Sequence, residues 1–189
     1  MALAVHPWPG PLPGWGEGVV VIGIATPAGA SRAEARAAIR QAVCETLAQL
    51  LAVPPAHITV ASAPGSAPRV LVDGAPVGTG LSISHAGGVS AAALRREGAV
   101  GIDLMEVEEV MDWARVALDY LGIATARRLA SLAPGERPLA FAQAWTAREA
   151  SLKLQGLPLS EWQPLPADCR VTPLALPPGL TGSVAIPAH

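Results

Sequence analysis

The chain has 189 residues, of which 51% are hydrophobic and 15% are charged, so it can bury a sizeable core and does not have the composition of a disordered protein. The net charge of −2 argues against a nucleic acid or an anionic membrane surface as the main partner. No apolar run approaches the roughly 20 residues of a membrane-spanning helix, and the Pro-rich start of the chain lacks the pattern of a secretory signal. Cys44 and Cys169 are isolated thiols without metal-type spacing, which fits a protein of the reducing cytoplasm.

The first part of the chain predicts one long helix among short strands. A β-branched run predicts a buried strand over 19–25, and Ser31 offers an N-cap for a helix over about 32–51. Two further strands are predicted over 57–61 and 69–72.

Residues 81–107 bring a hydroxyl, an imidazole and an acid close to glycines. Ser84 and His85 precede Gly87-Gly88, where the backbone can approach a ligand closely. Residues 89–94 and 99–105 predict a hairpin, and in its second strand the alternation of side chains places Asp103 on one face with Gly101. Asp103 is therefore either a functional acid among apolar neighbours or a strand-end carboxylate that caps the next helix.

The last part of the chain predicts three helices and then two short strands. The helices are expected over about 108–121, 125–132 and 140–154, and the strands within 169–186. In the third helix Phe141, Trp145 and Leu152 fall on one face, which we expect to be buried.

Glu149 and Lys153 are four residues apart in that helix and therefore lie side by side on it. They are either a metal ligand or base with its charge partner, or a stabilising ion pair on the surface. Lys153 is the only lysine of the chain, whereas the other twelve basic residues are arginines. This exception suggests a specific role, because Lys acts at a phosphate as a mobile point charge and Arg as a planar fork.

Two similar segments each precede a predicted helix: Val21-Ile22-Gly23-Ile24-Ala25 and Ala99-Val100-Gly101-Ile102-Asp103. They suggest a duplicated unit in which only the second copy carries the acid. The sequence therefore predicts an α+β fold of two similar lobes, with an N-terminal lobe over 1–80 and a C-terminal lobe with the motifs over 81–189.

Three motifs in order resemble those of the 4′-phosphopantetheinyl transferases. They are Ser82-Ile83-Ser84-His85, Val100-Gly101-Ile102-Asp103 and Trp145-Thr146-Ala147-Arg148-Glu149-Ala150-Ser151-Leu152-Lys153. The length and the apparent duplication are similar to the single-chain, surfactin-synthetase-activating type of that family. The resemblance implies two α+β lobes around a pseudo-two-fold axis, with coenzyme A and the active site in the cleft between them.

The resemblance also implies an activity. A Mg²⁺-dependent enzyme of this kind transfers the 4′-phosphopantetheine arm of coenzyme A to a serine of an apo acyl or peptidyl carrier protein, and adenosine 3′,5′-bisphosphate leaves. Asp103, Glu149 and Lys153 would be catalytic: Asp103 and Glu149 as metal ligands, Glu149 also as general base, and Lys153 as the cation at the pyrophosphate. His85, with Ser84 beside it, would hold the 3′-phosphate of coenzyme A. The expected species is a monomer whose partners are coenzyme A and the carrier protein of a fatty-acid, polyketide or peptide synthase.

Three positions depart from the common pattern of that family, and at one of them Arg148 stands where members usually have a lysine before the Glu, which keeps the charge but not the geometry. Many members carry a second acid where this chain has Met105, and Glu106 could replace that acid only through a β-bulge, since it points to the other face. A lysine that contacts coenzyme A phosphate in a Gly-Lys-Pro segment is replaced here by Ala75. Arginines would then have to bind the phosphates of coenzyme A. The candidates are Arg69 and a basic ridge at helical spacing formed by Arg32, Arg36 and Arg40. Most of this ridge also fits an ordinary solvent-exposed helix face.

The departures leave two other hypotheses open. One is an inactive module that binds coenzyme A or a carrier protein without modifying it. The other is a structural α+β domain in which Glu149 and Lys153 form a surface pair. For the acidic carrier proteins, the basic residues Arg115, Arg127 and Arg128 are candidate docking contacts.

Overall fold

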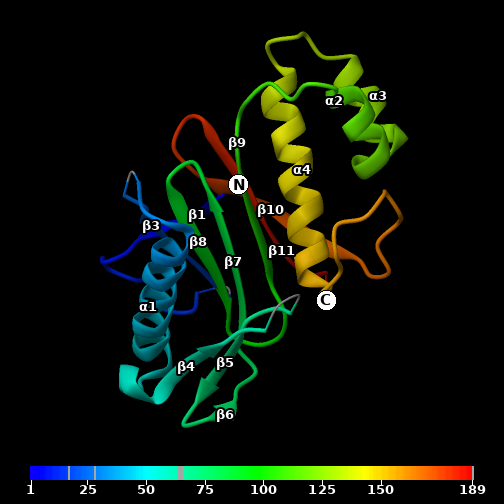
Figure 1. Ribbon diagram of the computed structural model, residues 1–189. Coiled ribbons are helices and arrows are strands. Elements are labelled where there is room, and N and C mark those ends of the chain that lie inside the picture. The colour runs from blue at the N-terminus through cyan, green and yellow to red at the C-terminus, as the bar shows by residue number, and fades with distance from the viewer. Residues whose placement is uncertain (17, 28, 64–65, 189) are drawn as a thin grey trace.

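The computed structural model describes residues 1–16, 18–27, 29–63 and 66–188. It is a mixed α+β protein in which two four-stranded sheets lie between two long helices, α1 (Arg32–Leu51) and α4 (Arg137–Leu154), as Figure 1 shows. Among the described residues, no helix combines the length and the apolar composition that crossing a membrane requires.

The remaining elements are short. The strands are β1 (Leu3–Ala4), β2 (His6–Pro7), β3 (Val19–Ala25), β4 (Ile58–Ala61), β5 (Arg69–Val72), β6 (Ala75–Pro76), β7 (Gly80–Ala86), β8 (Val89–Arg95), β9 (Gly101–Glu106), β10 (Cys169–Ala175) and β11 (Leu180–Pro187). The helical segments besides α1 and α4 are a 3₁₀ turn (Pro55–His57), α2 (Trp113–Val116), a π-helical turn (Ala117–Leu121) and α3 (Ile123–Ala130).

The first sheet has the strand order β2-β3-β8-β7 and is covered by α1. The predicted start of α1 is confirmed: the Ser31 side chain accepts a hydrogen bond from the Glu34 N–H, and the Glu34 carboxylate accepts one from the Ser31 N–H. This reciprocal capping box fixes the first turn of the helix.

The predicted hairpin of residues 89–94 with 99–105 is wrong. β8 pairs with β7 and β3, whereas β9 pairs with β11 in the other sheet. The tight turn lies instead between β7 and β8, where Gly87 and Gly88 have φ angles of 54° and 70°. Two successive positive φ angles are what a type I′ hairpin turn needs, and glycine adopts them without strain.

The second sheet has the strand order β1-β10-β11-β9 and is covered by α4. Three of its strands, β9, β11 and β10, pair as β3, β8 and β7 do in the first sheet. In the first sheet, β3 precedes the long helix α1 and pairs antiparallel with β8, which also pairs with β7. In the second sheet, β9 precedes the long helix α4 and pairs antiparallel with β11, which also pairs with β10. The pairing groups β7 and β8, residues 80–95, with the first half of the chain.

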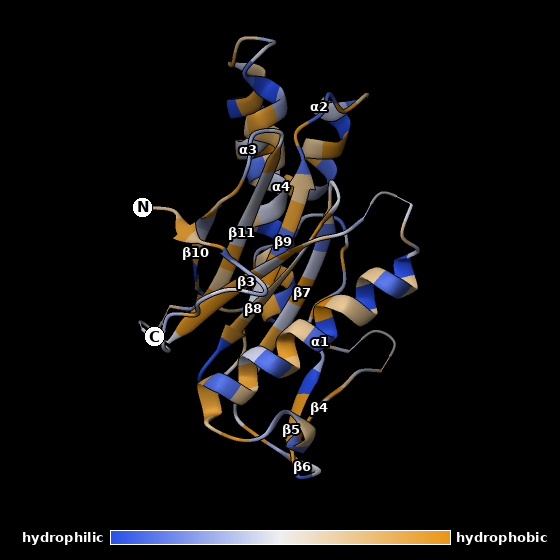
Figure 2. Cartoon of the chain, turned by 90° about the vertical axis from the view of Figure 1, so that its left-hand side faces the viewer, coloured by the Kyte–Doolittle hydropathy of each residue, from blue (hydrophilic) through white to orange (hydrophobic). Residues whose placement is uncertain are grey.

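Apolar side chains fill the spaces between these layers, and Figure 2 shows that the strands are mostly hydrophobic whereas α1 alternates between hydrophilic and hydrophobic residues. Between α1 and the first sheet lie Ile22, Ile39, Val43 and Leu47, among others. Between the two sheets lie alanines and branched aliphatic residues: Val21, Ala91, Ala93, Val100, Ile102 and Leu104. The alanines of β8 let the sheets pack closely.

The helix predicted over 108–121 begins later than expected. Asp112 has a φ angle of 55°, in the left-handed region, so that regular helix starts only at Trp113. After α2 the chain passes through the π-helical turn into α3, and this helical unit packs on the first half of α4 through Ala117, Leu121, Leu129 and Phe141.

Candidate functional site

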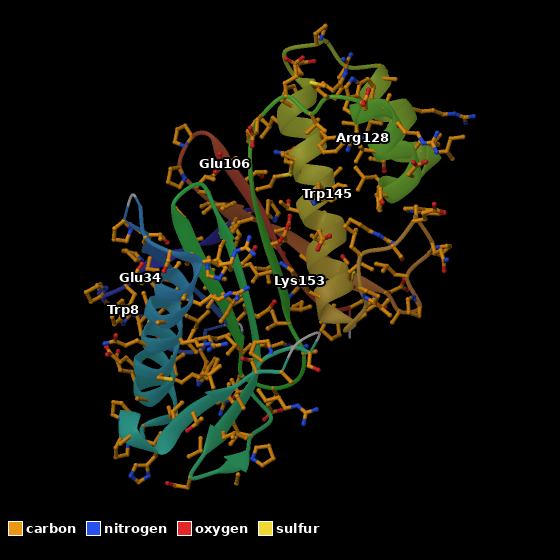
Figure 3. All side chains as sticks on the ribbon, in the orientation of Figure 1. Trp8, Glu34, Glu106, Arg128, Trp145 and Lys153 are labelled. Carbon is orange, nitrogen blue, oxygen red and sulfur yellow. The ribbon has the colours of Figure 1, made fainter. Side chains whose placement is uncertain are left out.

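The site forms where α4 crosses β9. Gly101 allows the two elements to approach, because a Cβ atom at Gly101 would overlap the carbonyl oxygen of Ala150. Since side chains alternate along a strand, Asp103 lies on the same face and points toward α4. Lys153 meets it there: its Nζ donates to Asp103 Oδ1 at 2.7 Å and to the Ile102 carbonyl oxygen at 3.1 Å. Figure 3 shows Lys153 on the side of α4 that faces β9.

Two serines of β7 hold β9 from its other side. The Ser84 hydroxyl donates to Asp103 Oδ1 at 2.9 Å and accepts from the Leu104 N–H at 3.1 Å. Ser82, two residues earlier on the same face, accepts from the Ile102 N–H at 3.1 Å. Serine side chains thus join the neighbouring edges of the two sheets. Among the described residues, both side-chain hydrogen bonds to the Asp103 carboxylate end on Oδ1, so Oδ2 of this largely buried side chain, which is 7% exposed, accepts none.

Glu149 lies one turn before Lys153 on α4 and is half-buried. Among the described residues, Lys153 forms its ion pair with Asp103, and Glu149 forms none. The alternative in which Glu149 and Lys153 form an ion pair on the helix surface is therefore not what the described residues show. Burial and, secondly, the negative charge of Asp103 raise the pKa of Glu149, while the charges of Lys153 and Arg148 oppose this rise. The positive charge of Lys153 thus acts on two carboxylates, Asp103 and Glu149.

An open groove of about 500 Å³ runs beside this contact, between α1, β7 and the end of α4. Its lining includes Arg32, Arg36, Ser84, His85 and Lys153. Two neighbouring hollows share lining residues with it, one of them His85 and the other Lys153. Burial and the nearby charges of Arg36, Lys153 and Arg32 lower the pKa of His85, so the imidazole is biased toward its neutral form.

The predicted binding residues are distributed unevenly around this groove. Ser84, His85 and Lys153 line it, whereas Arg69 is exposed at the start of β5 and is not part of the lining. The basic ridge of α1 does face the groove, since Arg36 and Arg40 also line the neighbouring hollow that shares His85 with it. Sequence spacing could place these arginines on one helix face, but it could not show that β7 lies opposite that face.

Glu106 does not reach the Asp103 face. β9 pairs with β11 without a bulge, with Met105 opposite Thr181 and Glu106 opposite Leu180. The Glu106 side chain packs beside Gly87, at the tip of the β7–β8 hairpin. Figure 3 shows Glu106 at the far end of β9 from Lys153.

Asp103 and Glu149 are the carboxylates that could hold a metal ion at this contact. Within the described part of the chain, no three His, Cys, Asp or Glu side chains gather as a metal-binding group. Mg²⁺, however, is commonly held by only one or two carboxylates, with waters and substrate phosphates as its other ligands. The donors present, Asp103 and Glu149, fit that type of site and do not fit a closed all-protein site.

Ser82 was not identified as a site residue from the sequence. The period of a strand places Ser82 and Ser84 on one face, so the alternation itself was the available signal. What that face meets depends on β9, which is brought there by the tertiary fold.

Residues 99–179 match the family model of the 4′-phosphopantetheinyl transferase superfamily. This segment contains Asp103, Glu149 and Lys153 and covers less than half of the chain. The strand with Ser84 and His85 precedes it. A comparison with curated proteins found no match.

Proposed function

We propose that this protein transfers the 4′-phosphopantetheine arm of coenzyme A to a serine hydroxyl of an apo carrier protein and releases adenosine 3′,5′-bisphosphate. The observation that carries the proposal is the contact of Asp103 with Lys153, 2.7 Å long, beside Glu149. All three residues lie in the segment that matches the phosphopantetheinyl transferase superfamily.

The reaction forms a bond between the serine oxygen and the phosphorus next to the pantetheine arm, and breaks the bond from that phosphorus to the bridging oxygen of the pyrophosphate. Glu149 is the base that accepts the serine proton, and its raised pKa suits a group that must hold a proton. Lys153 neutralises negative charge on the leaving group, which keeps the bridging oxygen. Asp103 and Glu149 would hold Mg²⁺, which supplies further neutralisation of the pyrophosphate when bound.

The groove supplies the other half of the site. His85 and the nearby arginines Arg32 and Arg36 offer donors and positive charge for the phosphates of coenzyme A. The 3′-phosphate is assigned to His85, with Ser84 nearby holding Asp103 through its hydroxyl. Arg36 is the first candidate to take the place of the lysine replaced by Ala75, because it lines both the groove and the neighbouring hollow that shares His85 with it. A contact from Arg69 stays a prediction.

The architecture proposed for this activity is the single-chain type with two similar lobes related by a pseudo-two-fold axis. The repeated strand pairing and the matching positions of α1 and α4 support it. A cytoplasmic monomer is proposed with it. For the carrier, the exposed Arg127 and Arg128 of α3 are the freer docking candidates, since Arg115 pairs with Asp119 within its own helical unit.

The test is the intact mass of apo carrier proteins from fatty-acid, polyketide and peptide synthases after incubation with this protein, coenzyme A and Mg²⁺. We expect one carrier class to gain the mass of one phosphopantetheine, and a chelator to abolish the gain. No gain on any class, with coenzyme A still bound, would overturn the proposal and favour a module that binds without transfer.

A further inference from the structure

A chain of two hydroxyl groups holds the buried edge of His85. The Nδ1 atom of His85 lies 2.7 Å from Ser90 Oγ, and Ser90 Oγ lies 3.1 Å from Thr26 Oγ1. Ser90 is fully buried, whereas His85 is exposed at the groove. The second ring nitrogen, Nε2, has no hydrogen-bond partner among the described residues, and the His85 side chain lines the groove.

Strand pairing explains why these three residues meet. His85 and Ser90 are direct partners across the β7–β8 hairpin, and Ser90 pairs with Ile24 of β3. Thr26 lies two residues beyond Ile24 and is therefore a diagonal neighbour of Ser90 on the same face. The backbone N–H of Thr26 also donates to the Gly88 carbonyl oxygen at 2.7 Å, which fixes the end of β3 against the hairpin turn.

We propose that Ser90 and Thr26 are positioning residues that select coenzyme A by its 3′-phosphate through His85; this inference rests on the proposed function. The two distances fit either direction of donation, and the direction assigned is that Thr26 donates to Ser90 and Ser90 donates to Nδ1 of His85. The proton of the neutral imidazole then sits on Nε2, where it can be donated to a phosphate oxygen in the groove. The opposite tautomer would present a lone pair to the phosphate and repel it.

The arrangement works with a neutral ring. The cationic residues Arg32, Arg36 and Lys153 face the same groove and disfavour a further positive charge on the imidazole. A neutral histidine donates through only one nitrogen, so the choice of tautomer decides whether it attracts or repels the ligand. The hydroxyl pair fixes that choice before the ligand arrives.

The experiment measures the binding of coenzyme A and of 3′-dephospho-coenzyme A by calorimetry, without any carrier protein. Ser90→Ala and Thr26→Val should weaken coenzyme A binding about five- to tenfold, the size of one lost hydrogen bond, and change 3′-dephospho-coenzyme A binding less than about twofold. Thr26→Ser, which keeps the hydroxyl, should bind both like the wild type. Thr46→Val, the same change at a fully buried threonine on the core side of α1, should also leave both affinities unchanged.

A second readout follows the tautomer directly. The ¹⁵N shifts of His85, assigned with a His85→Asn variant, should show Nε2 protonated in the wild type and a mixture of tautomers in Ser90→Ala. The inference is overturned if the variants weaken both ligands equally, if they weaken neither, or if the wild type does not distinguish the two ligands. A failure of the proposed function would look different: coenzyme A would be distinguished from its dephospho form, and no carrier would be modified.

Discussion

Lys153 donates a 2.7 Å hydrogen bond to Asp103, and this contact joins α4 to β9 across a separation of 50 residues in the chain. It is central to the proposed site, because the only lysine of the chain is directed to the carboxylate of the strand and not to Glu149, its neighbour on the helix. Glu149 is left half-buried, next to a second negative charge, and suited to accept a proton.

The first prediction concerns the free energy of unfolding as a function of pH. The folded-state pKa of Glu149 is raised by burial and by Asp103. Its contribution to stability is therefore complete below the ordinary carboxyl pKa and is lost as the pH rises through the raised value. Glu149→Gln removes this loss. The difference in unfolding free energy, variant minus wild type, should become more positive between about pH 4 and pH 8 in urea titrations. A difference that is flat or becomes more negative would contradict the raised pKa.

The second prediction concerns the close approach of α4 to β9. In Gly101→Ala the new methyl group would meet the Ala150 carbonyl oxygen and lie 2.6 Å from the Leu154 nitrogen, so α4 must move away. We expect a loss of about 3 kcal/mol in unfolding free energy, with phosphopantetheine transfer reduced as well. The control is Gly135→Ala, where a Cβ atom meets nothing within 4 Å and stability should change by less than about 0.5 kcal/mol. Equal effects of the two substitutions would argue against the packing described.

The third prediction separates the two serines of β7. Ser82→Ala and Ser84→Ala each leave a backbone N–H of β9 without its acceptor, so each should cost about 1–3 kcal/mol of unfolding free energy. Only Ser84 also donates to Asp103. Ser84→Ala should therefore reduce kcat of transfer more than Ser82→Ala does at matched stability loss. If Ser82→Ala were the more damaging in kcat, the role of Ser84 in holding Asp103 would be refuted.

The fourth prediction concerns His85 and the basic ridge. Burial, followed by the charge of Arg36, lowers the pKa of His85. In Arg36→Ala an NMR titration should show this pKa rising toward the ordinary value but remaining below it, because the burial remains. Coenzyme A affinity should fall in the same variant. Arg40→Ala is the control for the titration alone, since Arg40 donates a hydrogen bond to Ser62 and is not a cause of the His85 shift. An unchanged His85 pKa in Arg36→Ala would remove Arg36 from the site.

The sequence predicted those helices and strands that are determined by residues within or next to them. Ser31 predicted the start of α1, and the β-branched run predicted β3 with its observed bounds. The hairpin was misplaced because two turns, one at Gly87-Gly88 and one at Gly98, compete in the sequence, and the pairing of β9 with β11 is decided by distant residues.

The site was predictable in its residue types but not in its contacts. A sole lysine and an acid on a strand beside Gly101 pointed to Asp103 and Lys153. Whether Lys153 pairs with Glu149 or Asp103 depends on how closely α4 packs on β9, which no local pattern specifies. The link from His85 through Ser90 to Thr26 likewise depends on the pairing of three strands.

The most direct test compares three acid-to-amide variants in the intact-mass assay of an apo carrier protein. Asp103→Asn and Glu149→Gln should slow transfer by about 10²–10⁴-fold while coenzyme A still binds, because the first removes a carboxylate that would hold Mg²⁺ and the second removes the proposed base. Glu106→Gln, at the far end of β9, should transfer phosphopantetheine like the wild type. Wild-type turnover in Asp103→Asn or Glu149→Gln would contradict the assignment of the active site to the contact of β9 with α4.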